Sequence, residues 1–539
     1  MKEAIQELLI KYSDQIYSRE DLELEKRALC KKYHLAALPN SDILQQYRIL
    51  IAAGHPLPER LLGFLRKRAI RTLSGIASVA VLTKPYDCPG SCVYCPHEKN
   101  VPTSYLSNEP AVMRAIRCDY NPYQQIIWRL SALENNGHQP SKIELIVIGG
   151  TWSYLPDKYK YWYILNCFRA ANDYQKIKTK LLKQNDETLI NKGKFLNPFK
   201  QNLTLTNLRQ ALKKEQTKNE IAAYKIIGVT LETRPDYISE KELKQMRELG
   251  CTRVEIGVQI IDDKILKINR RGHDVAAITL ATKLLRQYGF KVTYHLMPAL
   301  PGATPQKDLE CFKRLFTDAR FQPDQIKFYP TVVTAGSLLY RWYLQGKYKP
   351  YSDKVLQKLI VACKEKVPTY VRIIRLIRDI PGESIIAGNK ITNLRQIMKE
   401  RGVLCRCIRC REAKELKLEL KYKLQVFNYS AAGGQEYFIS IDSFDNQTLF
   451  GFCRLRIDFM SPIAPAIIRE LHVYGELVPV GANKKTQHSG LGKKLMKHAE
   501  EIAHSLGVKK IAVISGVGAR SYYRKLGYHL QNTYMIKKL

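Results

Sequence analysis

Short β-branched runs alternate with helical stretches from residue 76 to about residue 378, and this alternation restricts the fold most strongly. Repeated strand–helix–strand units build a parallel sheet with right-handed crossovers. Their number favours a barrel or an incomplete barrel, in which active residues follow the carboxyl ends of the strands. The expected strands are 76–83, 142–148, 225–232, 253–259, 291–297, 325–330 and 372–378, and the expected helices include 121–135, 239–249, 274–288 and 353–366.

Regions of different character flank this α/β block. Residues 1–75 have apolar positions spaced by three and four, which predicts helices. After residue 412, several strand-like runs and a helix at 490–505 predict a mostly antiparallel α+β unit. The expected domains are a helical region at 1–75, the α/β barrel at 76–380, a linker at 381–412 and the α+β domain at 413–539.

One stretch interrupts the alternation. Between Tyr174 and Lys225 the chain is rich in Lys, Asn and Gln and has little periodicity. We interpret it as an inserted, mobile basic excursion, and an unrelated surface loop is the alternative.

The chain is strongly basic, with 87 Lys and Arg against 50 Asp and Glu and a formal net charge of +37. Residues 413–539 hold 19 basic and 10 acidic residues, so +28 falls on residues 1–412. This excess predicts a polyanionic partner bound mainly by the first three quarters of the chain, because bound phosphates release counterions. A basic run before the barrel is either a solvated face or a phosphate-contacting surface: Arg60, Arg66, Lys67, Arg68 and Arg71.

The sequence predicts a cytoplasmic protein without membrane contact. Its apolar runs are far shorter than the roughly 20 residues that span a bilayer, and its first residues lack the features of a secretory signal. Thirteen cysteines in such a chain favour metal or cluster ligation over disulfides.

Three cysteines follow the first expected strand with the spacing C-x3-C-x2-C: Cys88, Cys92 and Cys95. Three thiolates on one loop can hold three irons of a four-iron cluster and leave the fourth iron open. A structural zinc site is the alternative, but zinc normally takes four protein ligands. This pattern resembles the radical S-adenosylmethionine superfamily. Gly149 and Gly150, after the second strand, are similar to the superfamily's glycine motif for this cofactor.

Gln487, Gly490 and Gly492 form a Q-x-x-G-x-G pattern that opens the helix near the C-terminus. Backbone N–H groups at such a helix start can bind a pyrophosphate, because no side chains block its approach. A strand-like run precedes the pattern and Ser521–Tyr528 follows it, an order that resembles the GNAT acetyltransferases. Tyr522 and Tyr523 are the catalytic candidates of this unit, and Tyr523 is expected to protonate the departing thiolate. The alternative is that both tyrosines only pack the sheet.

Nearly all of the chain resembles the catalytic subunit family of Elongator, which acts on tRNA wobble uridine. The stretches that carry this resemblance are 71–77, 109–117, 232–237, 253–259, 378–381, 469–475 and 514–518. Their order along the chain also matches the family. Two features depart from it, namely the short spacer between Cys88 and Cys92 and the long basic stretch after Tyr174.

The resemblance implies a specific reaction. A deoxyadenosyl radical takes a hydrogen atom from the acetyl group of acetyl-CoA, which then adds to carbon 5 of the wobble uridine and leaves a carboxymethyl group. The implied cluster ligands are Cys88, Cys92 and Cys95, and the implied acetyl-CoA contacts are Lys142, Glu470, Leu471, His472, Val473, Leu491, Gly492, Lys493 and Tyr523. The implied nucleic-acid partner is the anticodon stem-loop of tRNA, while a homodimer and further Elongator-type subunits stay open.

A second cysteine group, Cys405, Cys407 and Cys410, matches a zinc site of the same family. Closely spaced soft ligands in a reducing compartment suit zinc. Cys363 is one candidate for the fourth ligand, and a second cluster or an empty reduced loop are the alternatives.

Two other functions compete with tRNA modification. In the first, the protein is a lysine acetyltransferase that uses the radical domain as a scaffold. In the second, it is an RNA-binding module without catalysis. The intact cysteine triplet and the strongly basic charge argue against the lysine acetyltransferase. The intact cysteine triplet and the helix-start glycines argue against the RNA-binding module.

Overall fold

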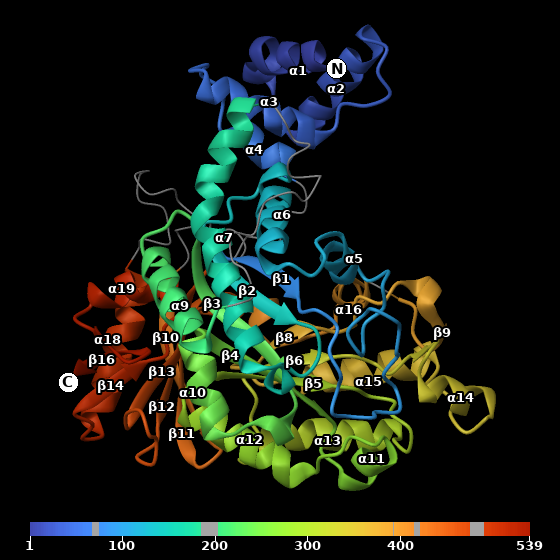
Figure 1. Cartoon of the computed structure of the whole chain (residues 1–539), viewed down its shortest axis with the longest axis vertical. Helices are drawn as coiled ribbons and strands as arrows, with labels where there is room; N and C mark the ends of the chain where they lie inside the picture. The colour runs from blue at the N-terminus through green and yellow to red at the C-terminus, as the bar shows by residue number, and fades with distance from the viewer. Residues whose placement is uncertain (67–74, 185–202, 392, 414–420, 475–489) are drawn as a thin grey trace.

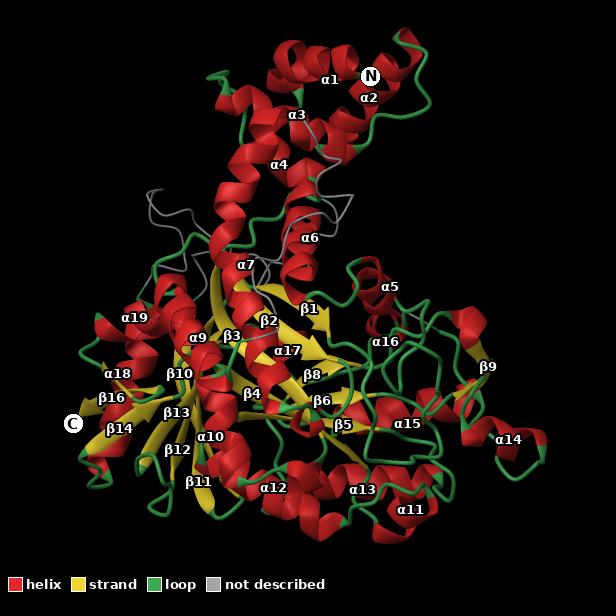
Figure 2. Ribbon diagram, viewed as in Figure 1, coloured by secondary structure: helices red, strands yellow, loops and turns green. Residues whose placement is uncertain are grey.

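The computed structural model describes residues 1–66, 75–184, 203–391, 393–413, 421–474 and 490–539 (Figure 1). Helices lie at the N-terminal end of the long axis, followed by a helix-covered sheet and a second sheet that holds the C-terminus (Figure 2). This arrangement confirms the predicted partial α/β barrel followed by an α+β unit.

Seven strands form the central sheet in the order β1-β2-β3-β4-β5-β6-β8, and all neighbours are parallel. Alternate residues of a strand face opposite sides, so Ile143, Leu145 and Val147 of β2 are buried in the core. The strands are β1 (Ala77–Leu82), β2 (Lys142–Ile148), β3 (Lys225–Thr233), β4 (Cys251–Gln259), β5 (Lys291–Leu296), β6 (Gln325–Phe328) and β8 (Arg372–Arg375), with a small pair formed by β7 (Val333–Thr334) and β9 (Ile385–Ala387).

Helices cover the outer face of this sheet, and several begin at side-chain caps. Ser239, Asp274 and Thr304 each accept a hydrogen bond from a backbone N–H of the first turn. The helices of this part are α5 (Pro110–Arg117), α6 (Pro122–Asn135), α7 (Asp157–Gln184), α9 (Leu205–Asn219), α10 (Glu240–Glu248), α11 (Asp263–Ile268), α12 (Val275–Gln287), α13 (Pro305–Thr317), α14 (Leu338–Leu344), α15 (Asp353–Glu365), α16 (Leu394–Glu400) and α17 (Ile408–Arg411).

The second sheet has the order β10-β11-β12-β13-β14-β16-β15, and its neighbours are antiparallel except β13 and β14. The predicted mostly antiparallel unit is therefore confirmed, with β15 as a strand that the sequence did not predict. Its elements are β10 (Tyr422–Ala431), β11 (Gly434–Ser443), β12 (Leu449–Ile457), β13 (Ala466–Val473), α18 (Leu491–Ser505), β14 (Lys510–Val513), α19 (Arg520–Arg524), β15 (His529–Gln531) and β16 (Tyr534–Lys538).

The N-terminal region is helical, as predicted, and has its own apolar core. Arg60 of the basic run donates to the carbonyl oxygens of Ile16 and Asp14 at 2.9 and 2.8 Å, so its guanidinium holds this region together. Arg66 Nε donates to the carbonyl oxygen of Gly137 at 3.3 Å, which joins the region to the barrel. The helices are α1 (Lys2–Glu7), the π-helix Leu8–Tyr12, α2 (Arg19–Lys32), α3 (Asn40–Ala52) and α4 (Arg60–Leu65), and Lys67, Arg68 and Arg71 lie outside the described residues.

The interpretation of 174–225 as an excursion without regular structure was wrong at both ends of the stretch. Helix α7 continues to Gln184, and α9 begins at Leu205. Asn172 Nδ2 donates to Glu215 Oε2 at 2.8 Å, so hydrogen bonds pair the two helices. Residues 185–202 lie outside the described part of the chain.

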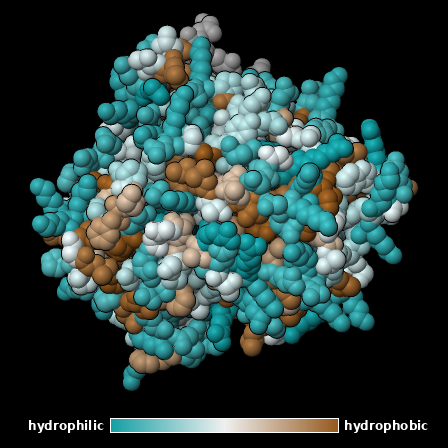
Figure 3. Space-filling view, turned by 90° about the horizontal axis from the view of Figure 1, so that it is seen from below, coloured by the Kyte–Doolittle hydropathy of each residue, from teal (hydrophilic) through white to brown (hydrophobic). Residues whose placement is uncertain are grey.

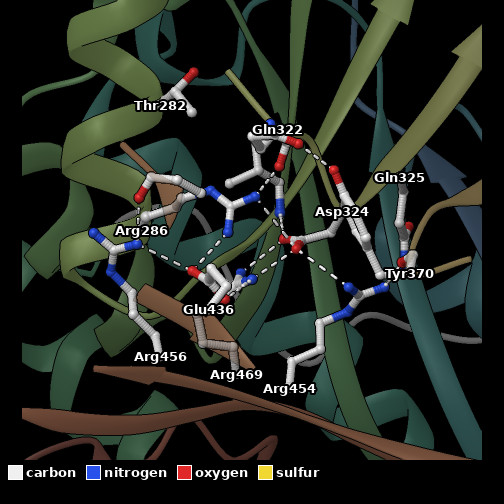
Figure 4. A network of polar contacts seen from close by, with 12 residues as sticks. Thr282, Arg286, Gln322, Asp324, Gln325, Tyr370, Glu436, Arg454, Arg456 and Arg469 are labelled. Carbon is white, nitrogen blue, oxygen red and sulfur yellow. Dashed lines mark hydrogen bonds and ion pairs between the residues drawn. The ribbon is translucent and has the colours of Figure 1, made fainter. Parts of the chain in front are cut away.

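Two buried carboxylates connect the barrel to the second sheet (Figure 4). Asp324 precedes β6, and Glu436 lies in β11. Arg469 Nη2 of β13 lies 2.6 Å from Asp324 Oδ1 and 2.7 Å from Glu436 Oε2. Arg286 of α12 also belongs to the group, with its Nη1 2.7 Å from Glu436 Oε1. Charge-assisted hydrogen bonds thus fix β13 against the barrel.

No described helix is long and apolar enough to cross a membrane. The face seen from below carries polar side chains around and between its apolar patches (Figure 3).

Candidate active site

A single cavity of about 1030 Å³ passes through the interior of the partial barrel. At one end it is lined by the predicted cluster ligands Cys88, Cys92 and Cys95. At the other end it is lined by residues of β12 and β13, including Glu470 and His472. The cysteine loop and the acetyltransferase-like sheet therefore open into the same cavity.

The cysteine loop lies between β1 and α5 and faces the carboxyl ends of the strands. Arg271 Nη1 donates to Cys92 Sγ at 3.0 Å. A hydrogen bond with the Cys95 thiol and the charge of Arg271 lower the pKa of Cys92, which favours its thiolate. Three soft sulfur donors at one end of a cavity fit an iron–sulfur cluster with an open iron.

The glycine pair predicted to contact the cofactor adjoins this loop. Gly149 and Gly150 have φ values of 130° and 106°, which side chains rarely adopt. A Cβ on Gly149 would lie 2.1 Å from Thr83 Oγ1, so only glycine allows this turn. Thr151 Oγ1 lies 4.0 Å from Cys88 Sγ, and the turn borders the cavity beside the cysteines.

At the acetyltransferase end, β13 and β14 separate partway along their length. They pair in parallel over Ala466–Ile468, whereas residues from Glu470 to Val473 pair with β12 alone. The exposed edge left by this separation is where the sequence predicts the acetyl-CoA contacts Glu470, Leu471, His472 and Val473. Glu470 and His472 line the cavity.

The predicted pyrophosphate loop leads into α18. Gly490 has φ of 81° and precedes the first helical residue, Leu491. A Cβ on Gly492 would lie 2.8 Å from Tyr522 Oη, so the helix start and this tyrosine are close neighbours. Lys493 lies in the first turn of the same helix, and Gln487 lies outside the described residues.

Tyr523 is buried beside this helix, with its ring centroid 5.3 Å from that of Tyr522. Burial raises the pKa of Tyr523 well above its usual value, so the phenol stays protonated at neutral pH and can donate a proton. Lys142 is the first residue of β2 and pairs in register with Lys225. Its side chain is exposed and does not line the cavity.

The sequence interpretation missed a charged cluster inside the barrel. Glu232, Glu255 and His295 come from adjacent strands, and their ligand atoms lie within 4.8 Å of one another. Lys327 of β6 contacts Glu255, and its Nζ lies 3.3 Å from Glu232 Oε1. Burial raises the pKa of Glu255, but the Lys327 and His295 contacts outweigh it and lower the pKa well below its usual value. The sequence did contain a signal for this cluster, namely charged residues within otherwise apolar strands.

Two stretches that carry the family resemblance meet at the cavity. Tyr105 Oη donates to Glu232 Oε2 at 3.0 Å, and the Arg378 guanidinium lies over the Tyr105 ring at 5.0 Å. Arg378 Nη2 also lies 3.1 Å from Glu109 Oε1. Glu109 and Arg378 therefore join the loop after the cysteines to the end of β8.

The second cysteine group lies at the acetyltransferase end of the barrel. The sulfurs of Cys405, Cys407 and Cys410 lie within 4.8 Å of one another, a separation that fits a shared zinc ion. Cys363 does not belong to this group, so it is not supported as the fourth ligand. Arg409, within the group, lines the cavity.

Comparison with known proteins identifies the family of this chain. The Radical SAM superfamily model matches residues 201–315, the Radical_SAM C-terminal domain model matches 323–402, and the Acetyltransferase (GNAT) family model matches 405–528. The tRNA uridine(34) acetyltransferase of Dehalococcoides mccartyi is 40% identical over 491 residues, which covers 88% of this chain and all of that protein.

Relatives from other organisms cover the chain equally well. Human Elongator complex protein 3 is 37% identical over 548 residues, with 96% of this chain and 93% of that protein covered. The structure of Methanocaldococcus infernus Elp3 lacking residues 1–46 superimposes with a TM-score of 0.70 and 36% identity, covering 86% of this chain and 99% of that one. The chain belongs to the family of the tRNA uridine(34) acetyltransferases and Elongator complex protein 3, which combines radical SAM and GNAT domains.

Proposed function

We propose that this protein attaches a carboxymethyl group to carbon 5 of the wobble uridine of tRNA, using acetyl-CoA and S-adenosylmethionine. The observation that carries the proposal is the single cavity that reaches from the cysteine loop to β13. A radical generated at one end and a thioester held at the other would then share one continuous space. The names of the relatives support uridine 34 as the target.

The chain's own residues take distinct roles in this proposal. Cys88, Cys92 and Cys95 would hold a four-iron cluster, which when bound would supply the electron for reductive cleavage of S-adenosylmethionine. The helix start at Gly490–Gly492 binds the CoA pyrophosphate through backbone N–H groups. Tyr523 donates a proton to the departing CoA thiolate.

We assign a function to each of the four regions predicted from the sequence. Residues 1–75 bind tRNA, 76–380 perform radical chemistry, 381–412 carry a structural zinc ion on Cys405, Cys407 and Cys410, and 413–539 bind acetyl-CoA. We also place the protein in the cytoplasm, where its tRNA substrate is found.

Gly492→Asp tests the link between the two domains. A carboxylate at the helix start opposes an anionic ligand, and like charges brought together cost several kcal/mol. We expect acetyl-CoA binding to weaken at least about 100-fold and uridine modification to disappear, while iron content and tRNA binding stay unchanged. Lys497→Asp, on the exposed face of the same helix, is the control and should behave as the wild type.

The same assay separates tRNA modification from lysine acetylation. Wild type and Gly492→Asp are each offered tRNA and a histone-like peptide, and the products are read by mass spectrometry. The proposal requires carboxymethyluridine from the wild type. Acetylated peptide with unmodified tRNA would establish the lysine acetyltransferase instead.

Salt dependence tests tRNA binding. The net charge of +28 on residues 1–412 predicts an affinity that falls steeply with salt. Reversing Lys67, Arg68 and Arg71 to Glu should weaken binding and flatten the slope of log Kd against log salt by about one for each phosphate that is no longer neutralised. Reversing Lys509, Lys510 and Lys525 of the acetyltransferase domain is the matched control. Equal effects from the two triple variants would contradict the N-terminal location.

A further inference from the structure

The proposed reaction contains a step that needs water. Once the acetyl carbon is bonded to uridine, the group is still a thioester of CoA, and the product is a carboxylate. The C–S bond must therefore be replaced by a C–O bond, with water as the source of oxygen. This inference rests on the proposed function and identifies the residues that activate this water.

β13 carries a histidine at the position where a thioester would arrive. His472 lies beyond Ile468, in the part of β13 that has separated from β14, and it lines the cavity. Its ring is stacked on Phe452, with 6° between the ring planes, and its centroid lies 4.3 Å from that of Tyr474. The Nε2 atom is enclosed and has no hydrogen-bond partner within the described residues.

The polar neighbours of His472 on the same strand are already engaged. Glu470 Oε2 accepts from Arg454 Nε at 2.9 Å, and Glu470 Oε1 lies 3.5 Å from Lys291 Nζ. Tyr474 Oη accepts from Arg372 Nη1 at 3.0 Å. The imidazole Nε2, in contrast, is left without such a partner in the described part of the chain, and an enclosed polar atom of this kind is free to bind a water or a ligand.

His472 stays neutral at physiological pH. Burial lowers its pKa to about 4, with Arg372 and Lys291 acting in the same direction and Glu470 and Glu412 opposing them. A neutral imidazole has a lone pair available for a proton.

A cation also lines the cavity. Arg409 of α17 lines the cavity and makes no hydrogen bond or ion pair with the residues that the structure describes. It shares Arg372 and Glu412 as charged neighbours with His472. An unpaired guanidinium beside like charges is suited to an anion.

We propose that His472 is the general base of thioester hydrolysis and that Arg409 stabilises the oxyanion. The imidazole takes a proton from water as its oxygen bonds to the carbonyl carbon, and the carbonyl oxygen becomes negative beside Arg409. The tetrahedral adduct collapses, the C–S bond breaks, and the thiolate receives a proton from Tyr523. The His472 imidazolium then releases its proton to water and the Tyr523 phenolate takes one up, which restores both side chains. The balance is thioester plus water to carboxylic acid plus CoA thiol, with no change of oxidation state.

The test measures release of CoA thiol from acetyl-CoA by the full-length protein, with and without tRNA. His472→Gln should lower kcat at least about 100-fold, as expected for loss of a general base. Arg409→Met should lower it by a similar factor, as for loss of one oxyanion donor. In both variants kcat should fall far more than the affinity for acetyl-CoA, measured separately as Kd. His529→Gln and Arg406→Met, which change exposed residues of the same types, are the controls.

Further measurements separate a catalytic from a structural role. His472→Phe keeps an aromatic ring in the stack and should be as inactive as His472→Gln, whereas added imidazole should partly restore His472→Ala. The wild-type rate should stay level down to about pH 5 and fall below it, because the base is protonated only near pH 4. Zinc content of Arg409→Met should equal that of the wild type.

The outcomes distinguish this inference from the proposed function. Wild-type rates of thiol release in His472→Gln, or an equal loss in His529→Gln, would overturn the assignment of the base. If wild type and His472→Gln form carboxymethyluridine equally well, the function stands and the inference fails. If the wild type releases CoA thiol through His472 but leaves tRNA unmodified, the proposed function fails and the base assignment stands.

Discussion

Replacing Cys88, Cys92 and Cys95 together by Ala is expected to remove all iron from anaerobically reconstituted protein and to reduce S-adenosylmethionine cleavage to background. All three thiols border the same end of the cavity, and the structure places Arg271 against one of them. No described cysteine outside this loop lines the cavity, so nothing there replaces the missing ligands. Iron content, visible absorbance and release of methionine are the measurements.

The same variant should keep its other activities. Zinc at Cys405, Cys407 and Cys410 and the release of thiol from acetyl-CoA depend on residues at the opposite end of the cavity. Ala at the buried cysteines Cys118, Cys251 and Cys363 is the matched control and should leave iron unchanged. Unchanged iron in the loop variant, or equal iron loss in the control, would contradict the cluster assignment.

The sequence predicted most of the helices and strands because the residues of each element carry its pattern. The expected run 142–148 is β2 to the residue, and the helix expected at 353–366 is α15. Helix α9 was missed because its stability comes from tertiary contacts. Its Glu215 accepts from Asn172 of α7, a partner 43 positions away. A polar segment of this kind shows little periodicity by itself.

The site was predicted only where motifs are contiguous. The cysteine loop and the glycines before α18 are each contained in fewer than ten residues, so spacing alone identifies them. Glu232, Glu255 and Lys327 are brought together by three different strands. The register between these strands, which makes the residues neighbours, cannot be derived from the sequence. The charged interior of the barrel could therefore be identified only from the structure.

The charged interface between the two sheets could not be predicted from the sequence either. Its members belong to separate segments of the chain: Arg286, Asp324, Glu436 and Arg469 (Figure 4). Removing Asp324 leaves Arg286 and Arg469 to share Glu436, so buried positive charge is in excess, and breaking a buried pair typically costs about 3–5 kcal/mol. We therefore expect Asp324→Asn to lower the free energy of unfolding by roughly that amount. Urea denaturation measures it, and Asp119→Asn, at an exposed aspartate, should change little.

The pH dependence of the free energy of unfolding tests independently whether the Asp324 carboxylate stabilises the fold. Burial raises the pKa of Asp324, but the Arg286 and Arg469 guanidinium groups outweigh it and hold the pKa below its ordinary value of 3.8. A lowered carboxyl pKa stabilises the fold above that ordinary value, and the stabilisation is lost as pH falls below it. The difference in stability between wild type and Asp324→Asn should therefore be full at pH 7 and shrink as the pH falls below 4.

A double variant tests whether Asp324 and Arg469 stabilise the fold as a pair. If the two side chains act as a pair, Asp324→Asn combined with Arg469→Met should cost clearly less than the sum of the single changes, since each single variant already removes the pair. Acetyl-CoA binding should weaken in Arg469→Met as well, because this arginine fixes the strand that carries Glu470 and His472 against the barrel. Additive costs with unchanged acetyl-CoA binding would show that the buried charges hold the two domains together without positioning β13.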